Sequence, residues 1–388
     1  MNKSSRVADS QPLLDLDSHI QPSPETYPIV AGEIGVKYKQ MFDDMMQSLP
    51  PDKAERVKRF AGPEIEEWSD ETVWTYKGSG APGALSPQGR LRTLDHMGVS
   101  RSLIFSDPGV QATAMGSETI AIATMQHWND FIVDFSSHDP ERLRGVAILN
   151  TANTATAIAE AARVVKAGGR AFVLPSSVPP GGASPASAEM DPLWALLEES
   201  SAAVTLHAGG EEGFLASQSW DDGVNHLKFE TIDYSAEGEQ ISTYLFATMS
   251  LAPQNFVTLM VLGGVFERFP KLRFGVIELG AHWLAPLALH LDNTYKIFTR
   301  RFEGVLSMLP SEYIRRNVRV TPYRIENVAD YIDRYGMAEC YCYSSDFPHP
   351  EGGQAPINDF ESHLARLTPK VITDFFCRNG EWVLPSLA

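Results

Sequence analysis

The chain has 388 residues, of which 43% are hydrophobic and 21% charged, a balance typical of a folded globular protein. A formal net charge of −17 argues against nucleic acid or an anionic membrane surface as a partner, although a local cation can still attract an anionic substrate. The length suits one barrel-sized domain with insertions.

Residues 1–12 are polar and are expected to form a flexible arm without a secretory signal. No apolar run reaches the roughly 20 residues that span a bilayer. The three cysteines (Cys340, Cys342 and Cys377) form no paired framework, which favours a reducing cytoplasm. A homodimer is the default expectation for the oligomeric state.

The first apolar strand is predicted over residues 13–16 and leads into Asp17 and His19. Alternate strand residues share a face, so these two side chains can converge on one ion. The pattern Asp-x-His is weak alone, because a helix-capping aspartate in a loop gives the same letters. Residues 27–88 then form a predicted helical insertion, whose Trp68 and Trp74 can line a pocket or simply hold the insertion down.

From residue 88 onward, apolar strands alternate with helical patterns. The later strands are predicted to end near Phe105, Asn150, Leu174, His207, Glu278, Thr321 and Asp346. With the first strand this gives about eight strand–helix units, which indicates a parallel sheet and fits a (β/α)8 TIM barrel. An open doubly wound sheet is the alternative, but the first strand lacks the Gly-rich phosphate turn of that fold.

Acids and histidines recur where these strands end. Asp17 and His19 follow strand 1, His207 ends strand 5, Glu278 ends strand 6 and Asp346 ends strand 8, while His282, His349 and Glu351 lie just beyond. Catalytic groups of a TIM barrel sit at the carboxyl ends of its strands. This mixture of imidazoles and carboxylates suits Zn²⁺, Mn²⁺ or Fe²⁺.

Residues 209–254, after strand 5, are expected to cover the barrel mouth as a lid. Aromatic and histidine side chains in the two insertions favour a bulky apolar or aromatic substrate, and the candidate substrate-binding residues are Trp68, Trp74, Trp220, His226 and Phe229. Candidates for holding a substrate carboxylate are Arg90, Arg170 and Arg324, although surface roles are commoner.

Several stretches resemble the amidohydrolase-related metal-dependent TIM barrels of the aminocarboxymuconate-semialdehyde decarboxylase type. They are LDLDSHI, TLHAGG, GGVFERFPKLRFGVIELGAHWLAPLALHLD and YSSDFPHPEG, and the resemblance runs from about Leu13 to Val383. It implies a single metal-dependent barrel domain over residues 13–388, with Asp17, His19, His207 and Asp346 as metal ligands. Two departures stand out: Asp17 replaces the His or Glu common at its position, and Glu278 stands where many decarboxylases of the family have a histidine.

Three hypotheses follow. The first is metal-dependent hydrolysis or non-oxidative decarboxylation of a small carboxylate, with Asp346 or Glu278 taking the proton and His282 or His349 acting as acid. The second is O₂ chemistry at two irons, as in a non-haem diiron monooxygenase of similar fold from diterpenoid biosynthesis, with Glu278 as an added metal ligand. The third, a barrel without catalysis, fits the complete ligand set poorly.

Overall fold

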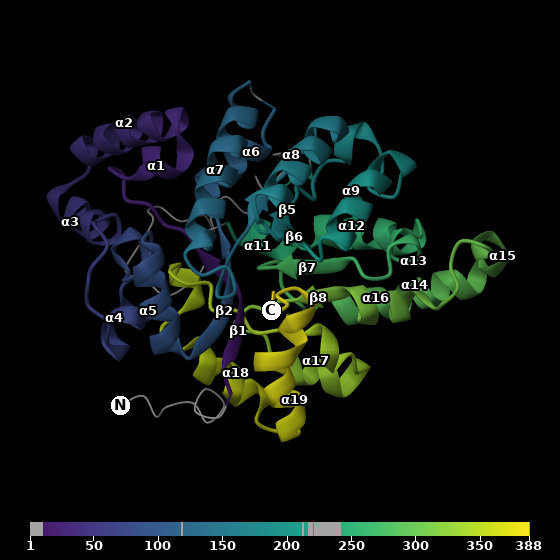
Figure 1. The fold of residues 1–388 in the computed structure, drawn as a ribbon. Helices are drawn as coiled ribbons and strands as arrows, with labels where there is room; N and C mark the ends of the chain where they lie inside the picture. The colour runs from purple at the N-terminus through teal and green to yellow at the C-terminus, as the bar shows by residue number, and fades with distance from the viewer. Residues whose placement is uncertain (1–10, 118, 212, 216–219, 221–241, 388) are drawn as a thin grey trace.

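The computed structural model describes residues 11–117, 119–211, 213–215, 220 and 242–387. Helices surround a central parallel sheet (Figure 1). The regular strands are β1 (Leu13–His19), β2 (Val99–Phe105), β3 (Leu143–Gly145), β4 (Ala147–Ile148), β5 (Ala171–Val173), β6 (Ala203–His207), β7 (Arg273–Ile277) and β8 (Val318–Val320). All of their pairings are parallel, in the orders β1-β2-β3 and β4-β5-β6-β7-β8.

Two local features separate this sheet from eight regular strands. The predicted third strand is interrupted at Val146, which divides it into β3 and β4. The predicted eighth strand is irregular, and we call residues 341–347 the closing segment. Isolated parallel bridges join it to β8 (Val320 with Tyr341) and to β1 (Ser18 with Phe347). These bridges complete the ring, so the fold is an α/β barrel of eight strand positions.

The irregular closing segment has a physical cause. Asp346 adopts a positive φ of 52°, which turns the chain out of extended geometry, and Pro348 follows without an N–H to donate. The segment still hydrogen-bonds to β1 through Leu16 N to Tyr343 O (3.2 Å) and Asp346 N to Asp17 O (2.9 Å). The two strands that carry Asp17 and Asp346 are therefore neighbours, although they lie near opposite ends of the chain.

The helices pack mainly on the outside of the ring. Those between β1 and β2 are α1 (Tyr27–Ala31), α2 (Glu33–Ser48), α3 (Pro51–Phe60), α4 (Asp70–Thr75) and α5 (Pro87–Met97). Those between β2 and β6 are α6 (Pro108–Met115), α7 (Ile120–Ser137), α8 (Thr154–Lys166) and α9 (Asp191–Glu199). The later ones are α11 (Thr243–Thr248), α12 (Leu251–Leu262), α13 (Val265–Arg268), α14 (Leu284–Ile297), α15 (Thr299–Phe302), α16 (Pro310–Asn317), α17 (Val328–Tyr335), α18 (Pro356–Leu364) and α19 (Pro369–Thr373).

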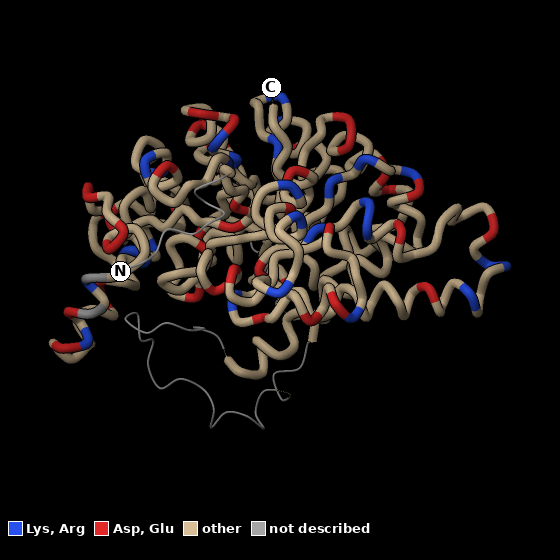
Figure 2. Tube along the Cα trace, turned by 90° about the horizontal axis from the view of Figure 1, so that it is seen from below, with Lys and Arg blue, Asp and Glu red and all other residues tan. Residues whose placement is uncertain are grey.

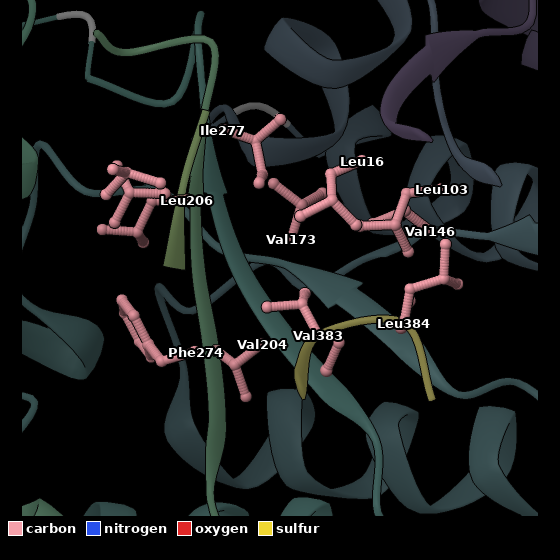
Figure 3. Packing of buried hydrophobic residues seen from close by; sticks show 14 of the residues in the cluster. Leu16, Leu103, Val146, Val173, Val204, Leu206, Phe274, Ile277, Val383 and Leu384 are labelled. Carbon is pink, nitrogen blue, oxygen red and sulfur yellow. The ribbon is translucent and has the colours of Figure 1, made fainter. Parts of the chain in front are cut away.

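The barrel interior is a packed apolar core. Figure 3 shows Leu16, Leu103, Val146 and Val173 facing one another, with Val383 and Leu384 of the C-terminal segment close by. Each of these side chains is at most 1% exposed. Such a core fills the barrel and leaves the chemistry to the ends of the strands.

One helical stretch, Thr243–Leu262, is long and apolar enough to cross a membrane by length and composition, with a mean hydropathy of 1.4 in its best window. The expectation that no such stretch exists was therefore wrong by this test. In the structure α12 buries Phe256, Val257, Met260 and Val261 inside the protein, as core helices do.

Candidate metal centre

Four side chains converge at the carboxyl end of the barrel. Asp17 and His19 come from the end of β1, His207 is the last residue of β6, and Glu278 follows β7 directly. One donor atom from each lies within 4.8 Å of the others, and a second group, His19, Asp346 and His349, meets the same criterion. The sequence prediction that strand-end residues gather here therefore agrees with the geometry.

The distances between donor atoms match those around a bound metal ion. His19 Nε2 lies 3.2 Å from Asp17 Oδ1 and 3.4 Å from Asp346 Oδ1. His207 Nε2 lies 3.3 Å from Asp17 Oδ1 and 3.5 Å from Glu278 Oε2. Two ligands each about 2.1 Å from one ion lie about 3.0–3.4 Å apart at octahedral or tetrahedral angles, so the residues present fit a divalent metal.

Hydrogen bonds orient both histidines for metal binding. The Nδ1 atoms of His19 and His207 lie 3.0 and 2.9 Å from the backbone carbonyls of Ser106 and Ala208. A carbonyl only accepts, so this network assigns the proton to Nδ1 and leaves a lone pair on each Nε2. Those lone pairs face carboxylates, an arrangement that needs a cation between them.

The electrostatics of the site also call for positive charge. His19 Nε2 and Asp346 Oδ1 are buried and have no hydrogen-bond partner. Burial disfavours a charged His19, but Asp17 and Asp346 outweigh it and raise the pKa of His19 to about 10. Burial is likewise outweighed at Asp17 and Asp346, whose pKa values are lowered by the neighbouring histidines. The cluster thus attracts a proton or, in its place, a metal ion.

Backbone strain coincides with the two carboxylates at the edge of the cluster. Glu278 and Asp346 have positive φ angles of 56° and 52°, a conformation that costs a side-chain-bearing residue roughly 1–2 kcal/mol. At Glu278 the N–H donates to Thr321 Oγ1 (2.9 Å) and the carbonyl accepts from the Tyr323 hydroxyl (3.1 Å). These bonds hold Glu278 over the barrel mouth, where its side chain is 18% exposed against 1% for Asp17.

The two other predicted catalytic histidines lie in different places. The His349 ring stacks on His19 with centroids 3.9 Å apart, and its Nδ1 lies 2.9 Å from Asp346 Oδ1. The His282 side chain is 52% exposed and its Nδ1 lies 3.4 Å from Glu326. The structure therefore brings His349 to the cluster, whereas His282 faces Glu326.

A cavity of about 160 Å³ opens beside the cluster. Its lining includes Asp17, Glu278 and Asp346 together with Tyr323, Arg324, Ile325 and Glu351. The described lining residues do not include Trp68, Trp74 or Trp220. Trp68 donates to Thr93 Oγ1 on α5 (3.1 Å), Trp74 is half-buried, and Trp220 is 65% exposed. His226 and Phe229 lie outside the described residues.

The three arginines considered as carboxylate ligands separate clearly. Arg324 lines the cavity, and its Nε donates to the Glu351 carbonyl (3.1 Å). Arg90 is fully buried and donates to the Gly83 carbonyl (2.7 Å) and Ser18 Oγ (3.0 Å), so it supports β1. Arg170 precedes β5 and thus lies at the opposite end of the barrel.

Asp15 is a structural partner of the site that sequence reasoning missed. Its carboxylate accepts from Ser345 N (2.8 Å), Ser345 Oγ (2.7 Å) and Asp17 N (3.2 Å). Burial raises the pKa of Asp15 to about 7 despite these bonds. The side chain pins the closing segment to β1 where no regular ladder exists, and the bonds place Asp17 and Asp346 side by side. The letters LLDL gave no sign of a partner more than 300 residues away.

A parallel barrel with histidines and carboxylates at one end defines a metal-dependent TIM-barrel protein. The sequence profile of the amidohydrolase family matches residues 17–385. The chain belongs to this family.

Solved structures share the fold at low sequence identity. An amidohydrolase from Mycobacterium avium subsp. paratuberculosis K-10 is 16% identical, covers 97% of this chain and 99% of its own, and has a TM-score of 0.67. A 5-carboxyvanillate decarboxylase from Sphingomonas paucimobilis is 19% identical over 97% and 100% of the two chains, with a TM-score of 0.58. A dihydroxybenzoic acid decarboxylase from Polaromonas sp. JS666, with bound manganese and the inhibitor 2-nitroresorcinol, is 16% identical over 96% and 97%, with a TM-score of 0.62. The comparison with curated protein sequences finds no match.

Proposed function

We propose that the chain is a metal-dependent enzyme that decarboxylates without oxidation, or hydrolyses, a small carboxylate with an aromatic or apolar body. The observation that carries the proposal is the buried donor cluster, in which Nε2 of His19 and Oδ1 of Asp346 have no hydrogen-bond partner, beside a cavity that Arg324 also lines. Decarboxylases of aromatic acids with the same fold, one of them with bound manganese, support this choice.

The residues divide the work by position. Asp17, His19, His207 and Asp346 would hold the ion, which supplies a Lewis acid that polarises a carboxylate or acidifies a water. Arg324 binds the substrate carboxylate by charge-assisted hydrogen bonds. Glu278, the more exposed carboxylate at the mouth, exchanges a proton with the substrate, and His349 sets the charge of Asp346 through their contact.

The test is turnover by protein loaded with Mn²⁺, using hydroxybenzoates and methoxybenzoates for CO₂ release and amides, esters and lactones for hydrolysis. We expect the enzyme to turn over one carboxylated ring compound, with a rate that saturates as the substrate concentration rises. Arg324→Met should raise its KM roughly tenfold to a hundredfold with a smaller change in kcat, because the lost bonds act on binding. Arg366→Met, on an exposed arginine paired with Asp330 and Asp333, is the matched control. Metal-loaded protein inert towards every class would reject the proposal.

A second candidate function, diiron O₂ chemistry, has no support in the comparisons. One observation keeps it open to test: the donor atoms form two groups that share His19, and three carboxylates contribute to them. Elemental analysis of protein from cells grown without added metal separates the two candidates. One Mn, Zn or Fe per chain supports the lytic enzyme, whereas two irons per chain with O₂ consumption supports the oxygenase.

We also propose that residues 13–388 form a single domain and that the enzyme works in the cytoplasm as a homodimer. The predicted lid, residues 209–254, lies mostly outside the described residues. At the far end of the α14–α15 arm (Figure 1), Ile297 is 73% exposed and Phe298 42%, an apolar surface suited to a second copy. Light scattering of the intact protein and of Ile297→Glu tests this: a dimer that the substitution dissociates supports it, and a monomer in both rejects it.

A further inference from the structure

The amino end of the barrel, opposite the candidate metal centre, gathers arginines. Arg101 lies near the start of β2, Arg144 is on β3, Arg273 starts β7 and Arg170 directly precedes β5. Because parallel strands begin at the same end of a barrel, these side chains share one face. The charges of Arg101, Arg170 and Arg273 all act on Arg144. Figure 2 shows basic residues in blue beside the C-terminus, which packs at this end.

The hydrogen-bond partners of these arginines are mostly uncharged. Arg144 Nη2 donates to the Pro385 carbonyl (3.1 Å), and Arg273 Nη1 donates to the Trp382 carbonyl (2.7 Å). Carbonyls satisfy donors without cancelling the positive charge. The nearby glutamates, Glu141 and Glu381, both form their ion pairs with Arg101, at 3.2 and 3.9 Å.

Arg144 is the most deeply buried of the four arginines. The residue is only 3% exposed, and its Nε and Nη1 atoms are buried without a hydrogen-bond partner. Burial and the neighbouring arginines lower the pKa of Arg144 to about 10, which still leaves it charged at neutral pH. Glu141 acts in the opposite direction on Arg144, but it makes no hydrogen bond to Nε or Nη1. A buried guanidinium with unmade hydrogen bonds is costly, so this position favours a hydrogen-bonding anion.

A cavity of about 220 Å³ lies at this position. Arg144 and Arg170 line it, with Ser136, Ser137 and the backbone of Gly168 and Gly169, and its described lining contains no aspartate or glutamate. Arg170 is anchored there, because its Nη1 donates to the carbonyls of Val165 (2.8 Å) and Gly169 (2.7 Å). A partly enclosed space that two arginines line, with no carboxylate among its described lining residues, is suited to an anion.

We propose that this cavity binds a small oxyanion, a phosphate, sulfate or carboxylate group, between Arg144 and Arg170. The site is separate from the metal centre because the packed core of the barrel lies between the two ends. It accounts for a concentrated positive surface in a chain whose formal net charge is −17. An anion there would stabilise the folded state, because the unfolded chain offers no such pair of cations.

The experiment is thermal unfolding of the full chain in sodium sulfate, phosphate, acetate or chloride at matched ionic strength. Sulfate binds divalent metals weakly, so its effect reports little on the metal centre. We expect sulfate and phosphate to raise the midpoint saturably, by roughly 2–4 °C at about 20 mM, with no such rise in chloride. A rise in acetate alone would identify a carboxylate as the ligand class instead.

Variants locate the effect. Arg170→Met should abolish the anion-dependent rise, whatever it does to the baseline midpoint, and Arg144→Met should do the same if it folds. Lys166→Met is the matched control: it removes one positive charge at the end of α8, outside the cavity lining, and should keep the rise. An anion effect of equal size in Arg170→Met and in the natural chain, or no saturable effect at all, would overturn the proposal.

Discussion

The two ends of the barrel are built on opposite electrostatic plans. At the carboxyl end, the buried atoms without a hydrogen-bond partner include His19 Nε2 and Asp346 Oδ1. At the amino end, they include Nε and Nη1 of Arg144. The side chains at one end therefore favour a cation, and those at the other end favour an anion. The apolar core of the barrel separates these two clusters of opposite charge preference. One fold can hold both because the clusters do not pair with each other.

The largest effect is expected from removing the histidine that both donor groups share. His19→Ala should reduce bound metal to below about 10% of the natural content and lower turnover by roughly 10³-fold, because both donor groups lose the ligand that they share. Metal analysis and kinetics check this, with His138→Ala, an exposed histidine, as control. Retained metal would place the ion away from β1.

Glu278 distinguishes proton transfer from metal binding at the same end. Glu278→Gln should lower turnover by at least about 100-fold and leave metal content within about twofold, because Asp17, His19, His207 and Asp346 remain. Loss of the metal along with activity would make Glu278 a ligand. Loss of one of two irons would favour the oxygenase.

Asp15→Asn is expected to have a smaller effect through position alone. The asparagine amide has one acceptor oxygen where the carboxylate has two. The hydrogen bonds from Ser345 Oγ and N therefore weaken, and Asp346 moves away from Asp17. We expect metal affinity to fall roughly 10–100-fold while the metal-bound enzyme keeps most of its kcat. Titration with Mn²⁺ measures this, and Asp95→Asn, on an exposed aspartate, should bind as the natural protein does.

The smallest effect is expected for the thiols near the arginine end. Burial raises the pKa of Cys340 and Cys342 to about 12, although Arg319 acts in the opposite direction. An unfolded thiol ionises near pH 9, so stability is unaffected below pH 9 and falls as the pH rises from 9 towards 12. Native protein should resist thiol reagents at pH 8 and react fully once unfolded. Rapid native labelling would show that burial does not protect these thiols.

The sequence was sufficient to predict the barrel and the cluster because both rest on a local pattern. An apolar strand that ends in an acid or a histidine is visible in ten residues, and parallel strands bring such ends together. The remainder depended on contacts between distant segments. Asp15 meets Ser345, and Trp68 binds α5 rather than the cavity, whereas Tyr323 and Arg324 reach the mouth from a loop. No local periodicity encodes those pairings.

Because the closing segment is irregular, an ion bound at the candidate metal centre would help to hold it against β1. The regular strands are joined by ladder hydrogen bonds, whereas the seam between the closing segment and β1 depends on one isolated bridge, a few backbone bonds and the Asp15 carboxylate. A metal held by Asp17 and Asp346 would join the two sides of this seam. In hydrogen-exchange terms, chelation should release the amides of residues 342–347 well before those of β6 and β7, and free metal concentration should set how often the ring opens.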